Sequence, residues 1–198
     1  MAGVESGRAF VGIICRGGEL SDLKISFLLA IVVVSSLVLG TVGVHASQNT
    51  GFGFNASNIS GISGSVSLTG GGAFSLADFI HSGGGFRCVD TVDKGPFALS
   101  NHGEAGCQAG EGVRWDAKEL LASFQFKCFG ADTPHTASTG DQIVVMKSDF
   151  YKASNGVHES FSDVPMIVSA VDLRPDLDGN QNVWIAGVGC GSAIVHFS

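Results

Sequence analysis

The feature that most constrains the fold is a series of short segments in which apolar and polar residues alternate. Examples are residues 65–69 (SVSLT), 124–128 (FQFKC) and 166–170 (MIVSA), and glycine triplets at 70–72 and 83–85 bound two such segments. Alternation with a period of two is typical of half-buried β-strands, and glycine suits the turns and bulges between them. About eight such signals at short spacing predict an all-β domain, either an antiparallel β-sandwich or a barrel.

One segment departs from this pattern. Asp116 and Glu119 have the spacing of a capping box, in which the first residue caps a helix and the fourth bonds back to it. Leu120 and Leu121 follow and would supply the buried side of that helix. We therefore expect one short helix, of about two turns, just before the strand that contains Phe124.

The chain before the β-rich region contains a segment with the pattern of a targeting signal. Ile25 to Leu39 contains no charge, Lys24 precedes it, and Val44 and Ala46 follow it. A cation, a short apolar core and small residues at positions −3 and −1 are typical of a secretory signal, which predicts cleavage before Ser47. Extended to Val44, the segment approaches the ~20 residues that span a bilayer, so a retained membrane anchor is the alternative.

These signals divide the chain into four parts. Residues 1–24 are an N-terminal extension whose acidic residues are unusual ahead of a signal, and a misassigned translation start, with Leu23 as the true one, would explain them. Residues 25–46 are the signal peptide or membrane anchor. Residues 47–64 (SQNTGFGFNASNISGISG) have the Gly/Ser/Asn composition of a flexible tether. Residues 65–198 form the predicted β domain.

Four cysteines lie in the part of the chain that follows the signal: Cys88, Cys107, Cys128 and Cys190. An even number behind an export signal predicts a disulfide framework. Four cysteines allow three pairings, and we favour Cys88–Cys107 and Cys128–Cys190. The first bridge would hold a glycine-rich excursion, and the second would tie an interior strand to the last one. No C-x-x-C pair is present, which disfavours a zinc site.

Charge and composition exclude some partners. The chain has a formal net charge of −7, and 15% of its residues are charged, against the ~25% of ordinary soluble domains. Nucleic-acid binders need a basic face, so this balance argues against nucleic acid as a partner. We expect a secreted, periplasmic or cell-surface protein with an extracellular or surface partner. Contact with a membrane is expected only through residues 25–44, if they are not cleaved.

An acidic and amide-rich stretch is the only candidate for a cofactor. Its members are Asp172, Asp176, Asp178, Asn180 and Asn182. Calcium prefers six to eight oxygen ligands, which closely spaced Asp and Asn can supply. The glycine and glutamate positions of an EF-hand loop are not matched, and Asp and Asn also favour turns through bonds to nearby backbone groups. A solvated turn is the favoured interpretation, calcium is the alternative, and no other cofactor is expected.

Three residues are candidates for ligand binding: Arg114, Trp115 and Trp184. A cation beside an indole can bind a polar ligand, but such a segment more often buries Trp and pairs Arg with a carboxylate. The chain has 14 Phe against one Tyr and two Trp, and usage dominated by Phe indicates core filling rather than an exposed recognition face. Neither an H-E-x-x-H nor a G-x-S-x-G motif occurs, so no catalytic residue is predicted.

Several strings are specific enough to compare with other proteins. LTGGGAF, GGGFRC, GEGVRWD and NVWIAGVGCGSAIVHF resemble a recurring pattern in uncharacterised exported bacterial proteins, and the resemblance covers most of residues 65–198. It implies export and a shared domain but no activity. The favoured function is therefore an exported β domain acting as a binding or structural module at the cell surface or outside the cell. The alternatives are a secreted hydrolase with a spatially assembled site, and a β barrel that binds calcium or a small ligand.

Overall fold

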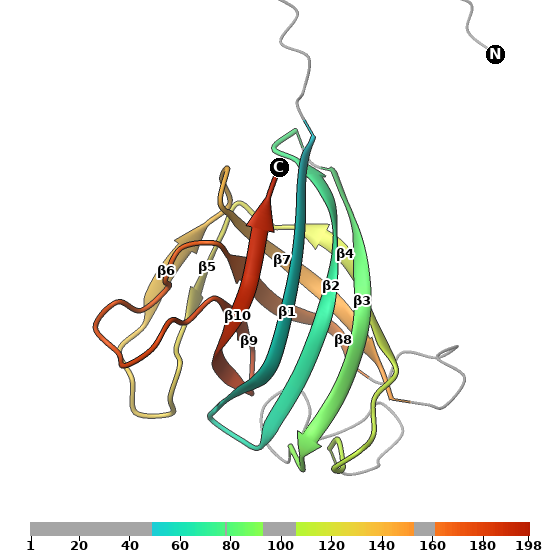
Figure 1. Ribbon diagram of the computed structural model, residues 1–198, viewed down its shortest axis with the longest axis vertical. Coiled ribbons are helices and arrows are strands. Elements are labelled where there is room, and N and C mark those ends of the chain that lie inside the picture. Colours follow the sequence, from blue (N-terminus) through green and yellow to red (C-terminus); the bar gives the residue numbers. More distant parts are fainter. Residues whose placement is uncertain (1–48, 78, 93–105, 153–160) are drawn as a thin grey trace, which may run out of the picture. The chain divides into compact units, whose positions relative to one another are not determined.

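A computed structural model describes residues 49–77, 79–92, 106–152 and 161–198 (Figure 1). The chain divides into two units, residues 1–46 and Ser47–Ser198, and every described residue belongs to the second. The predicted N-terminal extension and the predicted signal or anchor lie outside the described residues. Within the described ranges, no helix is long and apolar enough to cross a membrane.

The described part is built from antiparallel strands, as the sequence predicts. The strands are β1 (Thr50–Gly61), β2 (Ser65–Ser75), β3 (Phe79–Asp90), β4 (Arg114–Leu120), β5 (Ser123–Phe126), β6 (His135–Ser138), β7 (Ile143–Tyr151), β8 (Phe161–Ser169), β9 (Val183–Ile185) and β10 (Gly189–Phe197). Eight of them close into a barrel in the order β1-β10-β9-β8-β7-β4-β3-β2, and β5 and β6 form a separate two-stranded sheet. The all-β prediction is confirmed, and the barrel is the form that the fold takes.

The expected flexible tether is wrong for most of its length, because residues Thr50–Gly61 form β1. Phe52, Phe54 and Ala56 alternate into the core, while the residues between them face outward. The favourable free energy of burying these side chains offsets the entropy cost of ordering a segment whose Gly, Ser and Asn content suggested disorder. β1 pairs with β2 on one side and with β10 on the other, so this segment closes the barrel.

The expected short helix is also wrong, because the same residues form strand β4. Trp115 and Ala117 alternate into the core, and the strand pairs with β3 and β7. Asp116 forms an ion pair with Arg114 instead of capping a helix. Hydrogen bonding on both edges outweighs the weak local preference that a capping-box pattern expresses.

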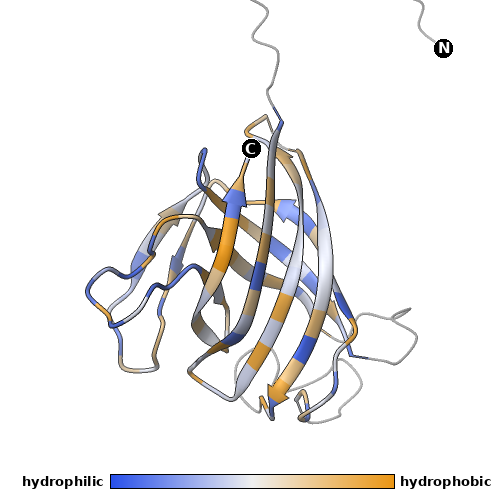
Figure 2. Cartoon of the chain, viewed as in Figure 1, coloured by the Kyte–Doolittle hydropathy of each residue, from blue (hydrophilic) through white to orange (hydrophobic). Residues whose placement is uncertain are grey.

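The interior of the barrel is filled by side chains, many of them aromatic. At one end Phe52 packs against Phe74 and Phe197, and further in Phe54 contacts Trp115. Figure 2 shows a pale, glycine-rich middle section of β2 and β3 between more hydrophobic stretches. Glycine is needed there because a Cβ at Gly70 would lie 2.7 Å from the Trp115 ring. The indole of Trp115 on β4 therefore reaches across β3 and occupies space that a side chain at position 70 of β2 would otherwise fill.

A second, smaller cluster lies on the outer face of the barrel wall, under β5 and β6. Val145, Ile167 and Trp184 project from β7, β8 and β9 and pack against Phe126 and Ala137 of the small sheet. Outward apolar residues explain why β7 is buried on both faces. The small sheet thus acts as a second layer over one side of the barrel.

Candidate functional site

Both favoured cysteine pairings are present in the structure. Cys88 and Cys107 are bonded with their Cα atoms 6.2 Å apart, and Cys128 and Cys190 with theirs 4.8 Å apart. The first bridge joins β3 to the segment that leads into β4. The second joins the segment just after β5 to β10. The two bridges are consistent with an oxidising environment, where disulfides persist.

Arg114 and Trp115 do not form one binding site, because adjacent strand residues face opposite ways. Trp115 is fully buried, and its Nε1–H donates to the carbonyl of Thr69 at 3.1 Å. Arg114 lies on the outer face, where it pairs with Asp116 and its guanidinium sits 4.0 Å from the centre of the Tyr151 ring. A ligand at the surface can reach Arg114 but not Trp115. The arrangement fits the structural interpretation of this segment.

The acidic loop between β8 and β9 is organised around a cation of the protein itself. The guanidinium of Arg174 makes a two-pronged contact with Asp176, at 2.9 and 2.8 Å, and also pairs with Asp132. Asp172 accepts hydrogen bonds from the backbone N–H groups of Arg174 and Gln181, at 3.0 and 2.9 Å. These carboxylates therefore stabilise the loop through bonds to nitrogen donors.

The other calcium candidates are spread over the same loop. The amide of Asn182 is buried and donates to the carbonyl of Ser169 at 3.2 Å, whereas Asp178 and Asn180 are exposed. In the described residues, no three His, Cys, Asp or Glu side chains are grouped so that they could hold a metal ion. The observed contacts give no support to calcium binding at this loop, which stays a prediction.

The electrostatic effect of Arg174 on its partners is strong. Its hydrogen bond lowers the pKa of Asp176 to about 2. Burial raises the pKa of Asp132, but the hydrogen bonds from Arg174 and from the Cys128 backbone outweigh this, and the net pKa is lowered. The hydrogen bond with Asp176 in turn raises the pKa of Arg174. All three groups are therefore charged at neutral pH.

The third ligand candidate, Trp184, lines a hollow of about 370 Å³. We call this feature the Trp184 hollow. The other residues that line it are mostly apolar: Ile62, Phe124, Gln125, Phe126, Lys127, Pro134, Ala186 and Gly187. The Trp184 ring lies 5.7 Å from Phe124 and 5.9 Å from Phe126, measured between ring centres. Its volume lies in the range of small-molecule sites.

The small sheet that forms one wall of the Trp184 hollow is fastened to the barrel at three points. The Cys128–Cys190 bridge is next to Trp184, because Cys190 and Trp184 are register partners in β10 and β9. The Trp184 Nε1–H donates to the carbonyl of Lys127 at 2.8 Å. Asp132, in the β5–β6 connection, pairs with Arg174. These links fix the wall, so the hollow is largely preformed.

The chemistry of the Trp184 hollow is that of apolar contact. The polar atom of the indole is already bonded, and only 4% of Trp184 is exposed. An open face on which a sugar ring could stack is therefore lacking at Trp184. The apolar edges of Trp184, Phe124 and Pro134 suit a small apolar or aromatic group.

A catalytic arrangement gains no support from the described hollows. Besides the Trp184 hollow there are hollows over Gly85 and at the end of the barrel near Asp141. No histidine lines any of these three, and Asp141 is the only carboxylate side chain among their linings. His102 and His158 lie outside the described residues. The hydrolase alternative stays an untested prediction.

Sequence reasoning identified Trp184 but missed its neighbours Phe124 and Pro134. The Phe124–Phe126 alternation was available as a strand signal, and it is confirmed as β5. What was not available was the placement of this strand outside the barrel and against β9. Contacts between segments so distant in sequence leave no local pattern.

Comparison with known proteins adds no family to this picture. No protein-family model, no curated protein and no solved structure matches the chain.

Proposed function

We propose that this protein is an exported binding module whose Trp184 hollow takes up a small apolar or aromatic group of its ligand. The observation that carries the proposal is the set of aromatic rings and Pro134 around a hollow of about 370 Å³. Such lining, with few polar groups, is typical of ligand sites in proteins. The three links that fasten the small sheet to the barrel support a preformed site, which lowers the entropy cost of binding.

Export is part of the proposal. The apolar segment after Lys24 supports a secretory signal, and the two disulfides support an oxidising destination. We propose a secreted, periplasmic or cell-surface location, with residues 25–46 removed or kept as an anchor. The resemblance to uncharacterised exported bacterial proteins supports the same location.

The two tryptophans provide a direct test of binding. Trp115 is fully buried in the barrel and Trp184 lines the hollow, so the two indole N–H signals in a nitrogen–proton NMR spectrum report on different places. Benzyl alcohol is a suitable probe because it is uncharged, aromatic and soluble. We expect it to shift the Trp184 signal saturably and to leave the Trp115 signal in place. Trp184→Phe assigns the signals.

A matched pair of variants locates the probe. Phe124→Ala removes a ring that lines the hollow, and we expect affinity to fall by about three- to tenfold, since an aromatic contact contributes roughly 0.5–1.5 kcal/mol. Phe129→Ala removes a ring from the β5–β6 connection that does not line the hollow and is 45% exposed. It should leave affinity unchanged. Equal shifts of both indole signals, or equal losses in both variants, would refute the proposal.

A further inference from the structure

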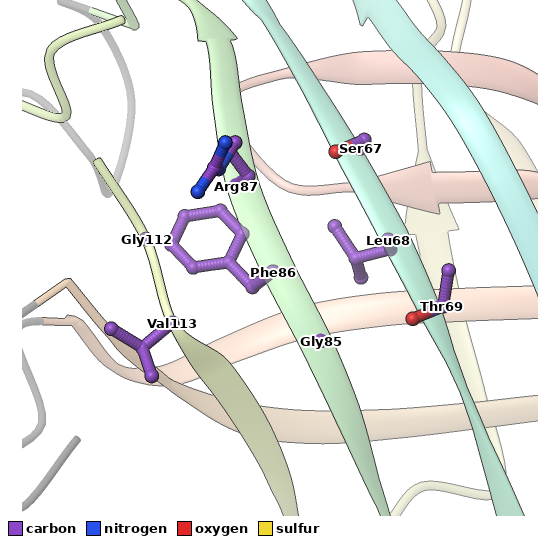
Figure 3. A pocket seen from close by; sticks show the side chains of 8 residues that line it. All are labelled: Ser67, Leu68, Thr69, Gly85, Phe86, Arg87, Gly112 and Val113. Atoms are coloured by element: carbon purple, nitrogen blue, oxygen red, sulfur yellow. The ribbon is translucent and has the colours of Figure 1, made fainter. Parts of the chain in front are cut away.

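A second hollow lies on the opposite side of the barrel from Trp184. Its volume is about 490 Å³, and it lies over Gly85 of β3 (Figure 3). Figure 3 shows Ser67 and Thr69 on β2, Arg87 on β3 and Val113 before β4 around this glycine. We call it the Arg87 hollow. β3 and β9 are four strands apart in both directions around the barrel, so the two hollows are separate.

The Arg87 hollow exists because two of the residues that line it, Gly85 and Gly112, have no side chain. Phe86 points into the core, so Gly85 and Arg87 face outward. A Cβ at Gly85 would have only the Thr69 Oγ1 within 4 Å, at 3.0 Å, which leaves open space above it. Gly112 has a φ of +114°, and a Cβ there would lie 2.7 Å from the Arg87 Cα. Position 112 is therefore restricted to glycine, which keeps this edge of the hollow open.

Arg87 stands out among the cations of the described residues. Five of these cations form ion pairs with carboxylates: Arg114, Lys118, Lys147, Lys152 and Arg174. Within the same ranges, no carboxylate pairs with Arg87 or with Lys127. Among the described residues, Arg87 is thus a positive charge without a carboxylate partner, and it borders a hollow.

Hydroxyl groups stand beside this charge. Ser67 is the register partner of Arg87, and Thr69 is the register partner of Gly85, so both side chains share the outer face with the guanidinium. A guanidinium offers several N–H donors in a planar fork that matches the oxygens of carboxylate, sulfate or phosphate. Serine and threonine hydroxyls add donors to the same oxygens.

From this geometry we infer that the Arg87 hollow binds the oxyanion group of a ligand. Arg87 supplies the charge, Ser67 and Thr69 supply neutral donors, and the empty space over Gly85 admits the group. Val113, which is partly exposed, offers an apolar contact to the part of the ligand next to the oxyanion. The inference does not depend on the Trp184 hollow, because no residue lines both.

The experiment uses the full chain in non-ionic detergent, with sodium sulfate, phosphate and acetate as probes against sodium chloride of equal ionic strength. The readout is the Nε–H signal of Arg87, assigned by its loss in Arg87→Gln. We expect a saturable shift with at least one of the three oxyanions, and their order identifies the preferred group. Equal response to chloride, or no saturable response to any of the three, overturns the inference.

Variants separate a built site from general attraction to positive charge. Binding of the preferred anion is measured by calorimetry, and Arg87→Gln should weaken it about tenfold or more, because hydrogen bonds to charged groups are strong. Lys127→Gln removes the other described cation without an ion pair, which lines the separate Trp184 hollow, and it should leave the affinity for the oxyanion unchanged. Gly85→Val fills the open space and should abolish binding. An equal loss in Arg87→Gln and Lys127→Gln overturns the inference.

Folding of the variants is checked by near-ultraviolet circular dichroism. Gly85→Ala provides a smaller change in case valine disturbs the sheet, and it should weaken binding without altering the spectrum. Unchanged affinity in a folded Gly85→Val protein overturns the inference.

The two proposals can fail separately. If benzyl alcohol does not shift the Trp184 signal but the oxyanion still binds, only the proposed function is refuted.

Discussion

The buried guanidinium of Arg174 pairs with Asp132, a residue 42 positions earlier in the chain. Arg174 belongs to the loop between β8 and β9, and Asp132 belongs to the connection between β5 and β6. Only 4% of the arginine side chain and 9% of the aspartate side chain are exposed. The pair therefore joins two excursions from the barrel that cover the same outer wall, next to the Trp184 hollow.

Removing this cation should destabilise the outer layer. Arg174→Met keeps most of the apolar stem but leaves Asp132 without its charge partner, and unpaired buried charges are costly. We expect the midpoint of thermal unfolding to fall. Lys147→Met is the control, because the Lys147–Glu119 pair lies on the surface, and its fall should be several times smaller. Equal falls would mean that burial adds nothing to the Arg174 pair.

Acid should weaken the contact between Arg174 and its second carboxylate partner, Asp176. The pKa of Asp176 is lowered from 3.8 to about 2 in the folded protein, mainly by the hydrogen bond from Arg174. A lowered folded-state pKa gives stability that is present above the unfolded value and is lost as pH falls toward 2. We expect the stability difference between the wild type and Asp176→Asn to be nearly complete at pH 6, to shrink as the pH falls below about 4, and to be mostly lost near pH 2.

Urea unfolding at pH 6, 4, 3 and 2 measures this difference. Asp178→Asn changes an acid of the same loop whose side chain makes no observed bond to Arg174, so it serves as the control. If the Asp176→Asn difference does not shrink between pH 4 and pH 2, the lowered pKa does not contribute to folding.

The two disulfides should contribute unequally. They close loops of 62 and 19 residues, and loop-closure entropy gives about 4 kcal/mol for Cys128–Cys190 and about 3 kcal/mol for Cys88–Cys107. The double variants Cys128→Ala/Cys190→Ala and Cys88→Ala/Cys107→Ala can be compared by urea unfolding. Only the first should also move the Trp184 indole signal, because its bridge ends beside that residue. A larger loss from the Cys88–Cys107 variant would contradict the entropy argument.

A buried serine hydroxyl offers a stabilising change. The Oγ of Ser148 is fully buried and has no hydrogen-bond partner among the described residues. Leaving such a group unbonded costs roughly 1–3 kcal/mol, so Ser148→Ala should raise the free energy of unfolding by about 1 kcal/mol.

Ser169→Ala is the matched control for this change. Ser169 is equally buried, but its hydroxyl donates to the carbonyl of Val171 at 2.6 Å and accepts from the Val171 N–H at 3.1 Å. Its loss should lower the free energy of unfolding by about 1 kcal/mol. Urea titration measures both variants. If Ser148→Ala also destabilises the protein, its hydroxyl is bonded in the folded state.

Strands β1 and β4 have sequences whose local features favour other structures. Phe52, Phe54 and Ala56 alternate, but the glycines and polar residues between them favoured a tether. Asp116 and Glu119 matched a helix cap by spacing alone. Both segments become strands because each is paired on both edges by strands from elsewhere in the chain. Local composition carries little information about such pairing.

The amino-acid sequence alone was sufficient to predict the all-β class, because period-two alternation specifies which side of a strand is buried. Four cysteines restrict the disulfide pairings to three, and it is the structure that shows the favoured pairs, Cys88–Cys107 and Cys128–Cys190. Three features became visible only in the folded chain: the sheet closes through β1, the small sheet covers β9, and Arg87 has no carboxylate partner in the described part. These depend on contacts between distant segments, whose free energy comes from burial and pairing after the chain has folded.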